Sequence, residues 1–159
     1  MFDEILGLPA HPLIIHFAVV LTPLLVAVAV VYALLPRWRV NVAWAVVLLS
    51  VATPAAVFAA RQSGESLKAA RFSTAEGEMA ARISTHQGFA NPLLLSVLGL
   101  GVAALLLVYA TRPSRDSVGR DRFGRPVTMI VSALTVVLAA VSGYYVFQAG
   151  DSGARAVWS

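Results

Sequence analysis

The residues of this chain that are best suited to chemistry are its three histidines, because the sequence contains no cysteine. Without thiolates there can be no disulfide, thiolate zinc site or cysteine-held iron–sulfur cluster, so redox or metal chemistry has to use histidine, methionine or carboxylates. His11 and His16 are five residues apart, or about 140° around a helix of ~3.6 residues per turn, and cannot share a face. The pair to weigh is therefore His16 with His86.

Membrane helices have to position these histidines, because the composition is that of a membrane protein. Hydrophobic residues make up 58% of the 159 residues and charged residues only 13%, which excludes a water-soluble enzyme and a disordered chain. Four apolar blocks each approach the ~20 residues that a spanning helix needs. The blocks are residues 12–35, 40–60, 92–110 and 127–148. We predict an all-α fold, an integral membrane four-helix bundle of two transmembrane hairpins, as a single domain over residues 1–159.

The polar connector between the hairpins, residues 61–91, is too polar to cross a bilayer. Ser73-Thr74-Ala75-Glu76 has the spacing of a capping box, which is typical of a helix start. The residues that then recur on one helical face are Met79, Ile83, His86 and Ala90. We predict a short amphipathic helix that starts near Thr74 and continues into the third span, with a kink at Pro92.

The distribution of basic residues predicts the orientation in the membrane. The two short loops carry Arg37, Arg39, Arg112, Arg115, Arg120, Arg122 and Arg125, whereas the terminal tails carry only Arg155. Short loops rich in arginine stay in the cytoplasm, so we expect both termini outside. The net charge of +4 is then mostly a topology signal, and we expect no nucleic-acid partner.

An antiparallel bundle with this topology brings His11, His16 and His86 to its outer end. Two imidazoles that project from different helices can hold a haem iron. We expect His16 and His86 as axial ligands of haem b, with His11 as a further candidate. In the alternative interpretation, His11 caps a helix, His16 bonds a neighbouring helix and His86 is solvated at the interface.

Two residues beyond the second span could support such a site. Glu65 could orient an imidazole as a hydrogen-bond acceptor, or Arg61 could hold the same carboxylate in an ion pair. The glycines and alanines at 99–104 predict a surface for close helix approach, and we expect the tail 150–158 to fold back over the outer end. The chain has no P-loop, G-x-S-x-G or H-E-x-x-H motif, which favours a non-enzymatic role.

The motif His11-Pro12-Leu13-Ile14-Ile15-His16-Phe17 resembles the opening signature of a bacterial membrane-protein family, domain of unknown function 2231. The resemblance extends over nearly the whole chain, through Ser63-Gly64-Glu65, His86 and the tail 150–158. It implies a multi-pass protein of the bacterial plasma membrane. Some relatives are fused to Rieske-type iron–sulfur domains, which implies an electron-transfer setting and haem b between the family's histidines.

The chain departs from the family pattern at two places. Many members carry a further histidine near Ala140-Val141-Ser142-Gly143, and close relatives often have histidine where this chain has Asp151. The leading hypothesis is a small membrane protein that binds haem b and serves electron transfer or a respiratory assembly. The alternatives are a non-catalytic accessory or assembly subunit with structural histidines, and a minor metal-handling or transport role. The expected partners are the lipid bilayer and respiratory or redox membrane proteins.

Overall fold

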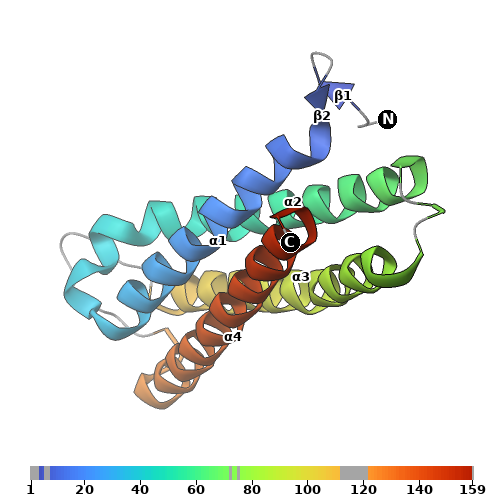
Figure 1. The fold of residues 1–159 in the computed structure, drawn as a ribbon. Helices are drawn as coiled ribbons and strands as arrows, with labels where there is room; N and C mark the ends of the chain where they lie inside the picture. The colour runs from blue at the N-terminus through green and yellow to red at the C-terminus, as the bar shows by residue number, and fades with distance from the viewer. Residues whose placement is uncertain (1–3, 6–7, 72, 75, 112–121, 159) are drawn as a thin grey trace.

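The computed structural model of the chain is almost entirely helical (Figure 1). It describes residues 4–5, 8–71, 73–74, 76–111 and 122–158, with side chains at 14–70, 73–74, 76–111 and 122–155. The long helices are α1 (Ala10–Leu34), α2 (Arg39–Arg71), α3 (Gly77–Thr111) and α4 (Arg125–Trp158). The short elements are the strands β1 (Glu4–Ile5) and β2 (Leu8–Pro9), which pair antiparallel, and the 3₁₀ helix η1 (Pro36–Trp38). The predicted all-α fold is confirmed.

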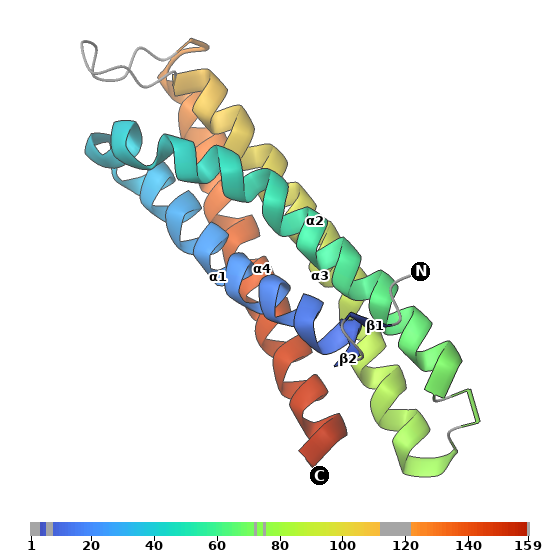
Figure 2. The ribbon, with the colours of Figure 1, turned by 90° about the horizontal axis from the view of Figure 1, so that it is seen from above.

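The four long helices run alternately up and down, so the start of α1 and the end of α4 lie at the end of the bundle where α2 is followed by α3 (Figure 2). Each helix packs mainly against the helices next to it in the chain, and α4 closes the ring by packing on α1. As a result α1 and α3 occupy opposite corners of the bundle. Residues on these two helices therefore meet only where they reach across the bundle axis.

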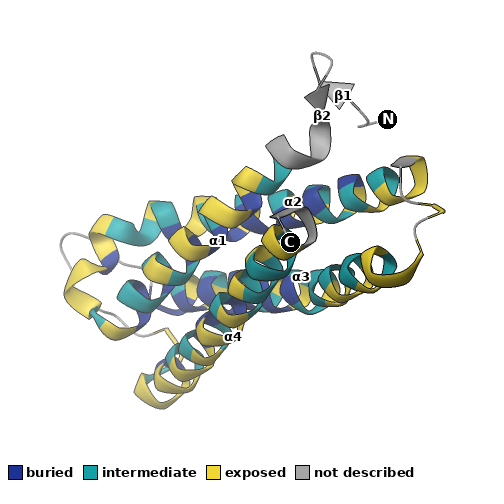
Figure 3. Ribbon diagram, in the orientation of Figure 1, coloured by how far each residue is buried: buried dark blue, intermediate teal, exposed yellow. Residues whose placement is uncertain are grey.

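All four long helices are long and apolar enough to cross a membrane. Figure 3 shows exposed positions along the outward faces of the helices. Many of these positions hold large apolar residues. Phe17, Trp44, Leu95 and Phe147, one from each helix, are between 65% and 70% exposed. Such an outer surface suits lipid chains, which are as apolar as leucine. The predicted transmembrane four-helix bundle is confirmed in this form.

The polar connector largely extends the spans as helix. α2 continues from the second apolar block to Arg71, and α3 begins at Gly77. The predicted start near Thr74 is therefore three residues early, because the chain turns at Gly77, where φ is 63°, a conformation that glycine adopts without strain. α3 then passes through Pro92 as one helix. The amphipathic character of its first turns stays a prediction.

The helices α2 and α3 approach each other closely at Gly101. A Cβ atom on Gly101 would stand 2.8 Å from the backbone oxygen of Ser50, so only glycine fits there without a shift. Pro54, four residues after Ser50, has no N–H to donate to that oxygen. The small-residue surface predicted at 99–104 thus has a specific function at Gly101, where it admits a backbone carbonyl of the neighbouring helix.

The opposite end of the bundle from the chain termini is tied by buried polar groups. Arg39 is only 8% exposed, and its Nε donates to the Tyr32 carbonyl over 3.0 Å. Its Nη2 lies 3.5 Å from the Ala33 carbonyl. The first residue of α2 therefore caps the last carbonyls of α1, which have no donors of their own helix. The Tyr32 hydroxyl in turn lies 2.7 Å from Thr111 Oγ1 on α3.

Candidate functional site

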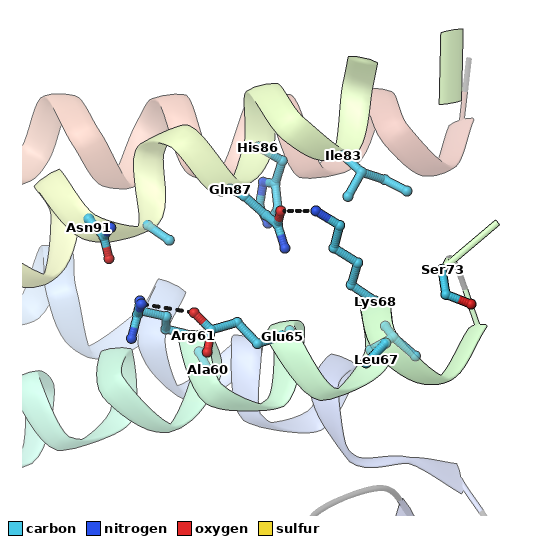
Figure 4. Close-up of a pocket in the computed structure, with 13 residues that line it drawn as sticks. Ala60, Arg61, Glu65, Leu67, Lys68, Ser73, Ile83, His86, Gln87 and Asn91 are labelled. Carbon is cyan, nitrogen blue, oxygen red and sulfur yellow. Dashed lines mark hydrogen bonds and ion pairs between the residues drawn. The ribbon is translucent and has the colours of Figure 1, made fainter. Parts of the chain in front are cut away.

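A cavity of about 630 Å³ opens between the polar extensions of α2 and α3 (Figure 4). Its volume falls within the ~300–1,000 Å³ typical of ligand pockets. The residues from α2 that line it are Ala60, Arg61, Gly64, Glu65, Leu67, Lys68 and Ala69. The remaining lining residues are Ser73, Ile83, His86, Gln87, Ala90 and Asn91. Basic, acidic, amide and imidazole groups thus share one cavity with short and branched apolar side chains.

On the α2 wall, Arg61 and Glu65 form an ion pair, with 2.8 Å between Arg61 Nη2 and Glu65 Oε1. The two residues are four apart, a spacing at which side chains are neighbours on a helix. The sequence allows Glu65 either to accept a hydrogen bond from an imidazole or to pair with Arg61, and the structure has the ion pair with Arg61. Their side chains are 29% and 51% exposed, so the pair contributes little to stability, and both groups remain accessible from the cavity.

One hydrogen bond crosses the cavity mouth. Lys68 Nζ on α2 donates to Gln87 Oε1 on α3 over 2.8 Å, and Figure 4 shows the two side chains reaching toward each other between the helices. The pair links α2 to α3. Because it is exposed, a ligand could replace it at small cost.

The wall formed by α3 carries His86, which is half-buried. Its Nδ1 lies 3.1 Å from Ser152 Oγ on α4. A Cβ atom on Gly153 would stand 3.1 Å from His86 Cε1, so the imidazole lies directly against the backbone of α4. His86 is thus held between two helices and also reaches the cavity. The end of α4 covers one side of the ring, so His86 is only partly open to solvent.

The tail after residue 149 builds this part of the site, but not as expected. It does not fold back over the bundle, because α4 continues as helix to Trp158. Its helical path is supported by an ion pair between Arg155 Nε and Asp151 Oδ2 at 2.8 Å. Arg82 on α3 also donates to the Arg155 carbonyl over 3.0 Å. Asp151 is therefore an ion-pair partner of the same helix.

The structure brings together some of the predicted site residues and separates others. His86, Glu65 and Arg61 all line the cavity. His16 is an exposed residue of α1, the helix diagonal to α3, and does not belong to the cavity lining. The side chain of His11 lies outside the described residues, as does the whole basic segment 112–121.

Lys68, Gln87, Ser152 and Gly153 belong to the site but were not identified from the sequence. The tail 150–158 contains two glycines and an Asp–Arg pair, but this pattern does not indicate which residue contacts His86. The positions of Lys68 and Gln87 in the sequence do not indicate that their side chains meet between two helices.

The donor set decides which inorganic groups suit the cavity. Among the residues with described placement, no cluster of three or more His, Cys, Asp or Glu side chains could hold a metal ion. A porphyrin-bound iron needs one or two axial ligands from the protein, and the cavity offers the His86 imidazole together with the cationic side chains of Arg61 and Lys68 for carboxylates. These residues fit haem b with one ligand from the cavity.

Comparison with known proteins places the chain in a family. No curated protein and no solved structure is significantly similar to it. A family model described as "Predicted membrane protein (DUF2231)" matches residues 7–159, which includes all four long helices and every residue of the cavity. The chain therefore belongs to the DUF2231 family of predicted membrane proteins.

Proposed function

We propose that this multi-pass membrane protein binds haem b in the cavity between α2 and α3, with His86 as an axial ligand, and that it serves electron transfer or a respiratory assembly. The observation that carries the proposal is the half-buried imidazole of His86 on the wall of a cavity of about 630 Å³. Imidazole is a common axial ligand of haem iron, and helix bundles build such sites between facing helices.

The remaining lining residues offer the two kinds of contact that an amphipathic cofactor requires, apolar and charged. Leu67, Ile83 and Ala90 offer apolar contact to a macrocycle. Arg61 and Lys68 offer cationic donors for carboxylate groups, and each already has a partner that it can exchange, Glu65 and Gln87 respectively. Haem b, when bound, supplies a reversible one-electron couple.

The absorption spectrum of protein purified from haem-replete cells tests this function. We expect a Soret band and a reducible b-type spectrum, lost in His86→Ala. His16→Ala separates the two modes of ligation, because it leaves the spectrum unchanged if His86 is the sole protein ligand and converts low-spin to high-spin iron if His16 is the second. Ser84→Ala, an exposed change two residues from His86, is the matched control. A colourless wild-type protein would contradict the proposal.

A specific contact favours a second function, that of a non-catalytic accessory or assembly subunit. The bond between His86 and Ser152 and the contact of Arg82 with the end of α4 are both suited to a purely structural role. In this case His86→Ala should loosen α4 from α3 without any change in colour. Proteolysis near the end of α4, compared between wild type and variant, distinguishes a structural from a ligand-binding histidine.

We further propose that both termini face outward from a bacterial plasma membrane, as the arginines in the short loops predict. The end of the bundle with the cavity would then lie outside. Because the chain has no cysteine, the single variants Ser84→Cys and Trp38→Cys can be labelled in intact cells with a membrane-impermeant maleimide. Ser84→Cys should react and Trp38→Cys should not. Labelling of both would contradict the orientation.

A further inference from the structure

Two residues near the end of α4, Ser152 and Gly153, lie against the His86 ring. Ser152 Oγ donates to the Ala149 carbonyl over 3.2 Å and also lies 3.1 Å from His86 Nδ1. A serine hydroxyl has one hydrogen to donate. When the Ser152 hydrogen goes to the Ala149 carbonyl, Ser152 Oγ can only accept from His86, and the hydrogen between the two side chains then belongs to Nδ1. This arrangement favours hydrogen on Nδ1 and a lone pair on Nε2.

Gly153 adds a steric condition to this assignment. A Cβ atom at position 153 would stand 3.1 Å from His86 Cε1 and 3.4 Å from Nδ1. The first distance is shorter than ordinary contact, so a larger residue would push the ring away from α4 and lengthen the bond to Ser152. Glycine at this position lets the imidazole lie against the helix backbone, where the donor on Nδ1 is within reach of its acceptor.

We propose that Ser152 and Gly153 are positioning residues that hold His86 as the tautomer protonated on Nδ1, so that the Nε2 lone pair is the atom this site offers to a ligand. The ligand class is then a metal-centred cofactor or a group that donates a hydrogen bond. Histidines that bind metals characteristically donate their other ring N–H to a nearby acceptor. The choice of a metal centre within this class rests on the proposed haem function, whereas the tautomer does not.

The docking of α4 does not depend on Ser152 alone, which makes the inference testable. Arg82 on α3 donates to the Arg155 carbonyl over 3.0 Å, one turn beyond Ser152. Apolar contacts between α3 and α4 continue along the bundle, as between Gly99 and Leu138. Removing the Ser152 hydroxyl should therefore leave α4 in place and change the chemistry of His86.

The experiment is nitrogen NMR of the full-length protein, labelled with ¹⁵N-histidine in detergent micelles at about pH 8.5, where imidazole is neutral. His86→Gln identifies the His86 signals. In wild type, Nδ1 should be pyrrole-like and Nε2 pyridine-like. Ser152→Ala should move the population toward hydrogen on Nε2, the form that a free histidine side chain prefers in water. Ser152→Thr, which keeps the hydroxyl, should restore the wild-type signals, and Ser84→Ala should not alter them.

Two results would overturn the inference: hydrogen on Nε2 in wild type, or signals that stay unchanged in both Ser152→Ala and Gly153→Ala. The wild-type spectrum alone decides the tautomer, so a variant that fails to fold does not remove the test. Titration with haemin then examines the link to function. Ser152→Ala should weaken haemin affinity about 10–100-fold. Correct tautomer signals without haemin binding would sink the haem proposal and leave the tautomer assignment standing.

Discussion

The same two helices, α2 and α3, pack in opposite ways in two regions of the molecule. In the closed region, around Ser50 and Gly101, a backbone carbonyl of α2 approaches a glycine of α3 so closely that no side chain fits between them. In the open region, around residues 60–69 and 83–91, polar and apolar side chains of the two helices line a cavity. Pro54 and Pro92 lie between these regions in the two helices.

The difference teaches that polarity alone does not mark the functional end of this bundle. The half of the bundle that contains the closed region, here called the closed half, also contains buried polar groups, such as Arg39, Tyr32 and Thr111. The other half, which contains the cavity, is called the open half. Their hydrogen bonds, however, go to main-chain carbonyls or to one another, and they lie in packed surroundings. In the open half the polar groups line a cavity, and two of their pairs, Arg61–Glu65 and Lys68–Gln87, are exposed enough for a ligand to replace them. The unfilled volume between the helices distinguishes the site.

The strongest test of the closed half is Arg39→Ala. Arg39 is buried and donates to carbonyls at the end of α1, and a hydrogen bond to a charged group contributes about 1.5–3 kcal/mol. We expect a loss of that size in the free energy of unfolding, measured by titrating a denaturing detergent into mixed micelles. The control is Arg37→Ala, an exposed arginine of the same loop. Equal effects of the two changes would mean that charge, not capping, is what matters.

Gly101→Ala tests the close approach itself. The new Cβ atom would stand 2.8 Å from the Ser50 carbonyl oxygen, and relief requires a movement of backbone rather than of a flexible side chain. Overpacking of this kind costs about 1–3 kcal/mol. Gly99→Ala is the matched control on the same helix, because its Cβ would meet Leu138 Cδ2 at an ordinary 3.5 Å. If Gly101→Ala unfolds at the same detergent fraction as wild type, α2 and α3 are not held as closely as described.

The contrast between the two regions also separates what the sequence predicts from what it does not. Apolar length predicts the four spans, and the small residues at 99–104 predict close approach. The Arg61–Glu65 pair was open to prediction because residues four apart on a helix are neighbours whatever the tertiary fold. Each of these inferences depends only on residues within one helix.

Contacts between helices were not predictable in the same way. Tyr32 and Thr111 are 79 residues apart, and His86 and Ser152 are 66 apart. Both contacts depend on the rotation of each helix about its axis, and the second depends on α4 continuing as helix past residue 149. Nothing in the apolar pattern specifies either property. Arg39 was interpreted only as a topology signal, because its burial depends on where the end of α1 lies.

Tyr32→Phe should have a smaller effect than either change above. It removes the hydroxyl that lies 2.7 Å from Thr111 Oγ1, but Thr111 still donates to the Leu107 carbonyl over 2.9 Å. One neutral buried hydrogen bond contributes about 0.5–1.5 kcal/mol. Tyr144→Phe, at an exposed tyrosine of α4, should leave the same detergent titration unchanged. A loss in Tyr32→Phe as large as that in Arg39→Ala would show that the tyrosine, not the arginine, ties α1 to its neighbours.

The smallest effect is expected in the open half, from Lys68→Ala and Gln87→Ala. Their hydrogen bond crosses the cavity mouth at 2.8 Å but is exposed, and exposed substitutions away from caps and cores usually change stability by less than about 0.5 kcal/mol. Each single change and the double change should therefore unfold like wild type, with no measurable coupling between the two positions.

A coupling above about 1 kcal/mol would mean that the bridge holds α2 and α3 together, as the carbonyl contact at Gly101 does. The bridge would then be a structural contact, because only a bond that stabilises the fold changes the free energy of unfolding when it is removed. Absence of coupling places the stability of the α2–α3 pair in the closed half and leaves the side chains of the open half available to a ligand.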